Sequence, residues 1–229
     1  MAHLRLRLFL TAMLIVSIAT CAWACPPNAA NSTAPSRVRL VNARAGVPDR
    51  SDGQFTVVIR DNANNPMPGA SVTLDFSGVP DVVLCSDQLD PDMLMSCAAH
   101  TVRKFTNAQG QVTFTVLGSS TGVNDVPSLG QPAMIFADGV LLGNIAVSTF
   151  DLDGMGGVGA NDLSILMADF GSGQPHDRSD FDGSGTVGAN DLSQWLGVFA
   201  SGASSESCRS ACSTRAGCQT APASCSART

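Results

Sequence analysis

The last third of the chain contains one sequence pattern twice, and this repeat constrains the fold more than any other feature. Residues 151–164 read Asp-Leu-Asp-Gly-Met-Gly-Gly-Val-Gly-Ala-Asn-Asp-Leu-Ser, and residues 180–193 read Asp-Phe-Asp-Gly-Ser-Gly-Thr-Val-Gly-Ala-Asn-Asp-Leu-Ser. Each copy has carboxylates at the first, third and twelfth positions and glycine at the sixth. This is the spacing of a calcium-binding loop followed by a helix. The duplication favours a paired unit over two unrelated turns.

The chemistry of calcium explains the spacing, because this hard cation takes about six to eight oxygen ligands and the loop must wrap around it. The predicted ligands are Asp151, Asp153, Gly157 and Asp162 in the first loop, and Asp180, Asp182, Ser184, Thr186 and Asp191 in the second. Met155 stands where an oxygen ligand belongs. We therefore expect two calcium ions, with the second loop the more secure. The alternative is two plain turns in which Asp162 and Asp191 cap helices.

Apolar residues follow each loop at helical spacing. They are Leu163, Leu166, Met167 and Phe170 after the first loop, and Leu192, Trp195, Leu196 and Phe199 after the second. Positions i, i+3, i+4 and i+7 share one helix face, so each loop is expected to lead into an amphipathic helix. The helices are expected to end near Gly171 and Gly202.

Over residues 150–202, the paired loops, each followed by a helix but not preceded by one, resemble the dockerin domains of secreted bacterial proteins. In that family the two loops bind calcium, and the folded pair docks onto cohesin modules during extracellular polysaccharide breakdown. The resemblance implies a dockerin-like module that binds a cohesin-like or other extracellular protein. The positions that match the family's partner-facing residues are Ala160, Asn161, Ala189 and Asn190.

The N-terminus is typical of a secretory signal peptide. Arg5 and Arg7 precede an apolar run over 8–22, and Ala-Trp-Ala at 22–24 offers a cleavage site. We predict a signal peptide over 1–24, a linker over 25–35, and export from a bacterium to the medium or the cell surface. Lipidation of Cys25 is the alternative to plain export. The apolar run is short for a membrane span, and no other segment qualifies.

Export makes the cysteines disulfide candidates. Cys85 and Cys97 bracket a polar loop and are expected to pair. The tail, residues 203–229, contains Cys208, Cys212, Cys218 and Cys225, for which three pairings stay open. A metal site in the tail is the alternative, but the tail has neither a CxxC pair nor a histidine.

Between the linker and the repeats, residues 36–149 alternate between apolar and polar. The apolar members of the alternation are Phe55, Val57, Ile59, Val72, Leu74, Phe76, Val112, Phe114 and Val116. A period of two predicts half-buried strands, and turn residues at 61–69 and 107–110 separate them. Further strands are expected at 134–136 and 140–150 around the turn at Asp138. Short strands with regular turns indicate an antiparallel sandwich of immunoglobulin-like size.

This segment also resembles a family, the bacterial Ig-like domains of the invasin type. The resemblance rests on the strand ending in Asp61, the turn at 65–70 that leads into Val72, and the run Thr-Asn-Ala-Gln-Gly-Gln-Val at 106–112. In those proteins the domain is commonly a spacer or adhesive module without catalysis. The expected fold class is therefore an all-β Ig-like sandwich plus a small α-helical dockerin-like double calcium-loop module over 150–202.

Composition argues against an enzyme, because the chain has one Glu, one Lys and no Tyr, and no Ser, His and Asp arrangement has recognisable spacing. His176 is expected in a solvated linker. The net charge of −6 disfavours nucleic acid and anionic membranes. We predict an exported, non-catalytic protein whose Ig-like module is tethered through calcium-dependent protein binding. The alternative is a surface adhesin or structural stalk with calcium-stiffened repeats and no cohesin partner.

Overall fold

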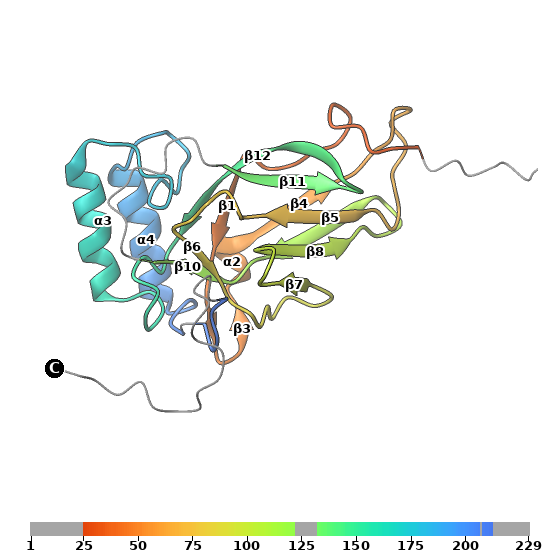
Figure 1. Cartoon of the computed structure of the whole chain (residues 1–229). Helices are drawn as coiled ribbons and strands as arrows, with labels where there is room; N and C mark the ends of the chain where they lie inside the picture. The colour runs from red at the N-terminus through yellow and green to blue at the C-terminus, as the bar shows by residue number, and fades with distance from the viewer. Residues whose placement is uncertain (1–24, 122–131, 207, 213–229) are drawn as a thin grey trace, which may run out of the picture.

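The computed structural model describes residues 25–121, 132–206 and 208–212, and these residues are mostly β-sheet (Figure 1). The main sheet curls like half a barrel and has six strands in the order β1-β12-β11-β5-β8-β7. Its strands are β1 (Arg37–Leu40), β5 (Ser71–Asp75), β7 (Leu94–Ser96), β8 (Thr101–Phe105), β11 (Ala133–Ala137) and β12 (Val140–Thr149).

Three smaller strand pairs and three short helices complete the described fold. The pairs are β4 (Gln54–Val58) with β9 (Gln111–Thr115), β6 (Val82–Leu84) with β10 (Gly118–Ser120), and β2 (Ala43–Arg44) with β3 (Val47–Pro48). The helices are α2 (Arg50–Gly53), α3 (Ala160–Ser172) and α4 (Ala189–Ser201). None of the helices in the described residues is long and apolar enough to cross a membrane. The predicted signal peptide, residues 1–24, lies outside the described part of the chain.

Within the main sheet, β1 runs parallel to β12 and the other neighbours are antiparallel. The tight turn between β11 and β12 contains Asp138 (φ 45°) and Gly139 (φ 81°). Two successive residues at positive φ suit the right-handed twist of a hairpin, and Asp and Gly tolerate that conformation best. The strands and the turn predicted from this part of the sequence are confirmed.

The first hydrophobic core lies between the curled sheet and the β4–β9 pair. It includes eight of the nine apolar residues predicted from the alternation: Val57, Ile59, Val72, Leu74, Phe76, Val112, Phe114 and Val116 are buried. Phe55 packs against this core while partly exposed, and its ring stacks on that of Phe114. Each fully buried side chain of this kind stabilises the fold by about 1.5–3 kcal/mol.

A second core joins the two long helices to the sheet. Val41 and Leu117, from the sheet side, pack in one cluster with Leu166 of α3 and Trp195 of α4. The indole Nε1 of Trp195 donates to the carbonyl of Phe150, just after β12, over 3.0 Å. The helices therefore bury their inner faces against the β part of the same chain.

This shared core corrects the predicted fold class. The expectation of an all-β Ig-like sandwich plus a small α-helical dockerin-like module is wrong, because the structure is a mostly β fold with a curled sheet and does not show a separate helical module. The physical reason is that two helices of this length bury too little apolar surface between themselves. They use the end of the sheet to complete their core.

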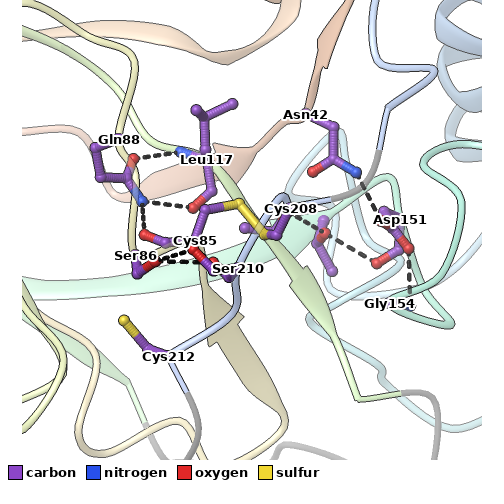
Figure 2. Close-up of a disulfide and its surroundings, with 12 residues drawn as sticks. Asn42, Cys85, Ser86, Gln88, Leu117, Asp151, Gly154, Cys208, Ser210 and Cys212 are labelled. Atoms are coloured by element: carbon purple, nitrogen blue, oxygen red, sulfur yellow. Dashed lines mark hydrogen bonds between the residues drawn. A yellow bond between two sulfur atoms is a disulfide. The ribbon is translucent and has the colours of Figure 1, made fainter. Parts of the chain in front are cut away.

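The described part of the tail, which ends at residue 212, also folds back onto the sheet. Cys208 bonds to Cys85, with a Cα–Cα distance of 5.2 Å (Figure 2). Cys212 bonds to Cys97, with a Cα–Cα distance of 5.1 Å. Between them, the backbone N–H of Ser86 donates to the carbonyl of Ser210 over 2.8 Å. The predicted Cys85–Cys97 pairing is therefore wrong, because the tail lies beside the strand β6 and its own cysteines are the partners of Cys85 and Cys97. Cys218 and Cys225 lie outside the described residues.

Candidate metal centre

The two repeated segments fold into two similar acidic loops at the helix end of the molecule (Figure 1). Loop 1 is residues 151–162 and follows β12; loop 2 is residues 180–191 and follows the linker after α3. In each loop, one carboxylate oxygen from each of the three aspartates lies within 4.8 Å of the others: Asp151, Asp153 and Asp162 in loop 1, and Asp180, Asp182 and Asp191 in loop 2. The structure thus brings together the acidic residues that the sequence singled out.

The twelfth-position aspartates close both loops in the same way. In loop 1, Asp162 accepts hydrogen bonds from the N–H groups of Leu152, Asp153 and Gly159, at 2.6, 2.9 and 2.7 Å. The equivalent bonds to Asp191 in loop 2 come from Phe181, Asp182 and Gly188 and measure 2.6, 3.0 and 2.7 Å. Both carboxylates thus cap the following helix, and the same bonds hold them facing the start of the loop.

The first-position aspartates are buried and differ in their partners. Asp151 accepts from the N–H of Gly154 over 2.7 Å and from the side-chain amide of Asn42 over 2.6 Å. Asp180 accepts from the N–H of Gly183 over 2.8 Å and from the guanidinium of Arg37 over 2.8 Å. Arg37 and Asn42 belong to β1 and the segment after it, more than a hundred residues away in sequence. Sequence reasoning missed both, because nothing local marks them.

Burial makes the negative charge of loop 1 costly. Burial raises the pKa of Asp151 to about 6, although the Asn42 amide acts in the opposite direction. Burial also raises the pKa of Asp162. Among the described residues, no salt bridge reaches a carboxylate of loop 1. Clustered buried carboxylates need a compensating positive charge, and an all-oxygen donor set suits a hard cation such as Ca²⁺.

The remaining predicted ligands lie in different surroundings. Ser184 and Thr186 of loop 2 are exposed, and the Ser184 hydroxyl donates to the Thr186 carbonyl over 3.0 Å. Hydrogen bonds from Ser184 hold the pKa of Asp182 below its usual range. Gly157 of loop 1 is buried against the tail, and the Met155 side chain is 69 % exposed. A thioether is a soft ligand that suits Ca²⁺ poorly, so Met155 adds nothing to the donor set of loop 1.

Gly157 meets the tail so closely that only glycine fits there. Its φ is +70°, and a Cβ atom would lie 2.5 Å from the carbonyl carbon of Ser205. Nearby, the N–H of Val158 donates to the carbonyl of Ser204 over 2.9 Å. At its seventh position loop 1 is therefore covered by the tail, whereas the matching residue of loop 2, Thr186, is exposed.

The predicted partner-facing residues lie in the first turns of the helices and are exposed: Ala160 and Asn161 in α3, and Ala189 and Asn190 in α4. The predicted apolar stripes are buried in part, since Leu166 and Trp195 are buried but four other members are not. Met167, Phe170, Leu196 and Phe199 remain 45, 42, 44 and 47 % exposed. Because these four occupy equivalent positions of the two repeats, both helices present an apolar outer face.

A Ser, His and Asp grouping that the sequence did not reveal lies at the end of α3. His176 is buried, its Nε2 lies 3.0 Å from the Ser172 hydroxyl, and its Nδ1 lies 3.6 Å from Asp169. Asp169 is, however, held by Arg178 through two bonds of 2.9 and 2.7 Å, and the Ser172 hydroxyl donates to the Asp169 carbonyl. This network secures the linker to the helix, so the expectation of a solvated His176 is wrong.

Comparison with known proteins found no matching family model, no matching curated protein and no matching solved structure. The function is therefore inferred from the geometry and chemistry of the two loops.

Proposed function

We propose that the protein is an exported, non-catalytic calcium-binding protein whose two acidic loops each bind one Ca²⁺ ion. The observation that carries this proposal is that two copies of one sequence pattern gather three aspartates each, two of them buried, with the same backbone hydrogen bonds. Three carboxylates held this close, two of them buried, repel one another, and a divalent cation relieves that repulsion. Two disulfides among the described residues suit an oxidising compartment such as the cell exterior.

Calorimetric titration of the chelator-treated mature chain (residues 25–229) with CaCl₂ tests this proposal. We expect saturable uptake of two ions, a higher melting temperature in calcium, and no comparable response to equal MgCl₂. Asp153→Ala and Asp182→Ala, at the less buried position of each loop, should each remove one ion. A wild-type melting curve and heat signal that do not respond to calcium would refute the proposal.

We further propose that calcium prepares the outer faces of α3 and α4 for an extracellular protein partner of the cohesin type. Support comes from the four exposed apolar side chains at equivalent positions of the two helices, together with the exposed residues Asn161 and Asn190 in the first turns of the same helices. Calcium at the loop ends would fix the first turns of both helices. Exposed apolar patches of this kind commonly mark protein contacts.

Binding of the mature chain to immobilised recombinant cohesin modules, in calcium and in chelator, tests the partner. Calcium-dependent binding that weakens in the Phe170→Ser and Phe199→Ser variants supports it. The surface variants Ser164→Ala and Ser193→Ala serve as matched controls, because they lie on the same helices. Absence of binding both in calcium and in chelator would exclude a cohesin-type partner.

The alternative of a structural stalk crosslinked through its tail is less favoured. Cys208 and Cys212, two of the four tail cysteines, form bonds within the chain. They are therefore not available to join neighbouring molecules.

A further inference from the structure

The two loops receive different side chains from the same stretch of the β-sheet. Arg37 in β1 donates from Nη2 to Oδ2 of Asp180 in loop 2 over 2.8 Å. Asn42, shortly after β1, donates from Nδ2 to Oδ2 of Asp151 in loop 1 over 2.6 Å (Figure 2). At the first position of the loop, therefore, loop 2 contacts a cation whereas loop 1 contacts a neutral amide.

The position of Arg37 is fixed from two directions. Its strand pairs in parallel with β12, where Arg37 lies opposite Ala146. Its Nη1 donates to the carbonyl of Asp177 over 3.0 Å, and its Nη2 also lies 3.7 Å from the Asp177 carboxylate. Because the Arg37 and Asp180 side chains are 15 and 1 % exposed, water screens their attraction poorly.

Arg37 also occupies an oxygen that a metal ion would need. Oδ1 of Asp180 accepts from the N–H groups of Gly183 and Ser184, at 2.8 and 3.1 Å. Oδ2 accepts from the N–H of Gly185, at 2.9 Å, and from Arg37. A cation that binds Asp180 must therefore share an oxygen with the guanidinium and lie close to its positive charge.

We propose that Arg37 is an internal counter-ion of loop 2, which stabilises this loop without calcium and lowers its calcium affinity, so that loop 1 fills first. This inference rests on the proposed calcium-binding function and adds the order in which the two sites fill. The order is opposite to the one expected from Met155 alone. Even in a mostly aqueous medium, one unit charge about 5 Å from a divalent ion changes affinity by about tenfold, so this is the smallest effect expected at the buried pair.

Calcium titration and melting of the mature chain carrying Arg37→Gln test the inference, with Asp153→Ala and Asp182→Ala assigning each binding step to a loop. In the wild type we expect the first ion to bind loop 1. In Arg37→Gln we expect loop 2 to bind calcium more tightly, by about tenfold or more, while the calcium-free melting temperature falls. A purely structural residue would not move these two readouts in opposite directions.

Three variants serve as controls. Arg37→Lys keeps the charge and should keep loop 2 affinity near that of the wild type. Arg39→Gln removes the same charge two residues further along β1. The Arg39 guanidinium donates to the carbonyl of Phe181 over 2.7 Å and to the side-chain amide oxygen of Gln194 over 2.6 Å. This variant should change the calcium affinity of loop 2 much less than Arg37→Gln does. If Arg37→Gln does not fold, the Arg37→Met variant, which keeps the apolar stem of the side chain, is used in its place.

The outcomes separate this inference from the proposed function. If the wild type binds no calcium, the proposed function fails, and the role of Arg37 fails with it. If the wild type binds two ions but Arg37→Gln leaves loop 2 affinity unchanged or weakens it, only the counter-ion role is overturned. Loop 2 filling before loop 1 in the wild type would overturn it too.

Discussion

Loop 1 and loop 2 have nearly the same sequence but different surroundings. Loop 1 is covered by the tail, and its first carboxylate, Asp151, accepts from the neutral amide of Asn42. Loop 2 is more open, and its first carboxylate, Asp180, pairs with Arg37. A repeated motif thus sets the donor atoms of a site. The neighbouring parts of the fold set the charge around those atoms and their exposure to solvent.

We expect the largest difference between the loops when the tail, which covers loop 1, is released from the sheet. Replacing Cys85, Cys97, Cys208 and Cys212 together by Ala should lower the free energy of unfolding by about 5 kcal/mol or more. Loop 1 should lose calcium affinity while loop 2 largely keeps it, because the tail contacts loop 1 at Val158. Denaturant unfolding and calorimetry measure the two effects.

Removing only the Cys85–Cys208 bond should cost less, about 3 kcal/mol, because Cys97–Cys212 still closes nearly the same chain loop. The two bonds span 123 and 115 residues. Equal loss of calcium affinity in both loops would show that the tail does not distinguish them.

The second prediction uses the seventh position of the loops. Gly157→Ala should destabilise the protein by about 3 kcal/mol, since a side chain there adopts positive φ and meets the tail backbone. Thr186→Ala at the matching, exposed position of loop 2 should change stability by less than about 0.5 kcal/mol. Thermal melting in chelator measures both. An equal loss of stability in the two variants would contradict the conclusion that the tail covers loop 1 whereas loop 2 is open at this position.

A third prediction concerns the pH dependence of the calcium-free protein. The pKa of Asp151 is about 6 in the folded chain and 3.8 in its ordinary state, so between these values the folded state binds more protons. The unfolding free energy should therefore fall by about 2 kcal/mol as the pH rises from 4 to 6.

Asp151→Asn should remove most of this slope, and saturating calcium should remove it in the wild type. Melting curves in chelator at several pH values measure the slope. Persistence of the full slope in Asp151→Asn would assign it to other groups, and the burial argument for loop 1 would then be wrong.

The variant with the smallest predicted effect tests whether the fifth position of the loop supplies a calcium ligand. Met155→Ser gives loop 1 the residue that loop 2 has at its fifth position, and should raise the calcium affinity of loop 1 by about fivefold, since a hydroxyl or its bound water can reach the ion. Stability without calcium should barely change, because Met155 is exposed. Calorimetry in the Asp182→Ala background isolates loop 1. Unchanged affinity would mean that the fifth position does not contribute a ligand.

Local patterns in the sequence predicted much of the fold. Period-two alternation located β4, β5 and β9, and helical spacing located α3 and α4, because both patterns reflect which side of an element faces a core. The same spacing overstated the burial of Phe170 and Phe199, since periodicity shows that a helix has an apolar face but not how much of it is covered. The acidic residues of each loop also come together, because they lie within one short segment.

Local sequence accounts for strands β4, β5, β9, β11 and β12, for helices α3 and α4, and for the two sets of three aspartates, because these depend on neighbours within about a dozen residues. Only the tertiary structure decided that the helices complete their core on the sheet, that Cys85 pairs with Cys208, and that Arg37 and Asn42 reach different loops. The disulfide and the contacts of Arg37 and Asn42 join residues more than a hundred positions apart, and the helix core also draws on residues far from the helices in sequence. They depend on the path of the whole chain, which no local pattern specifies.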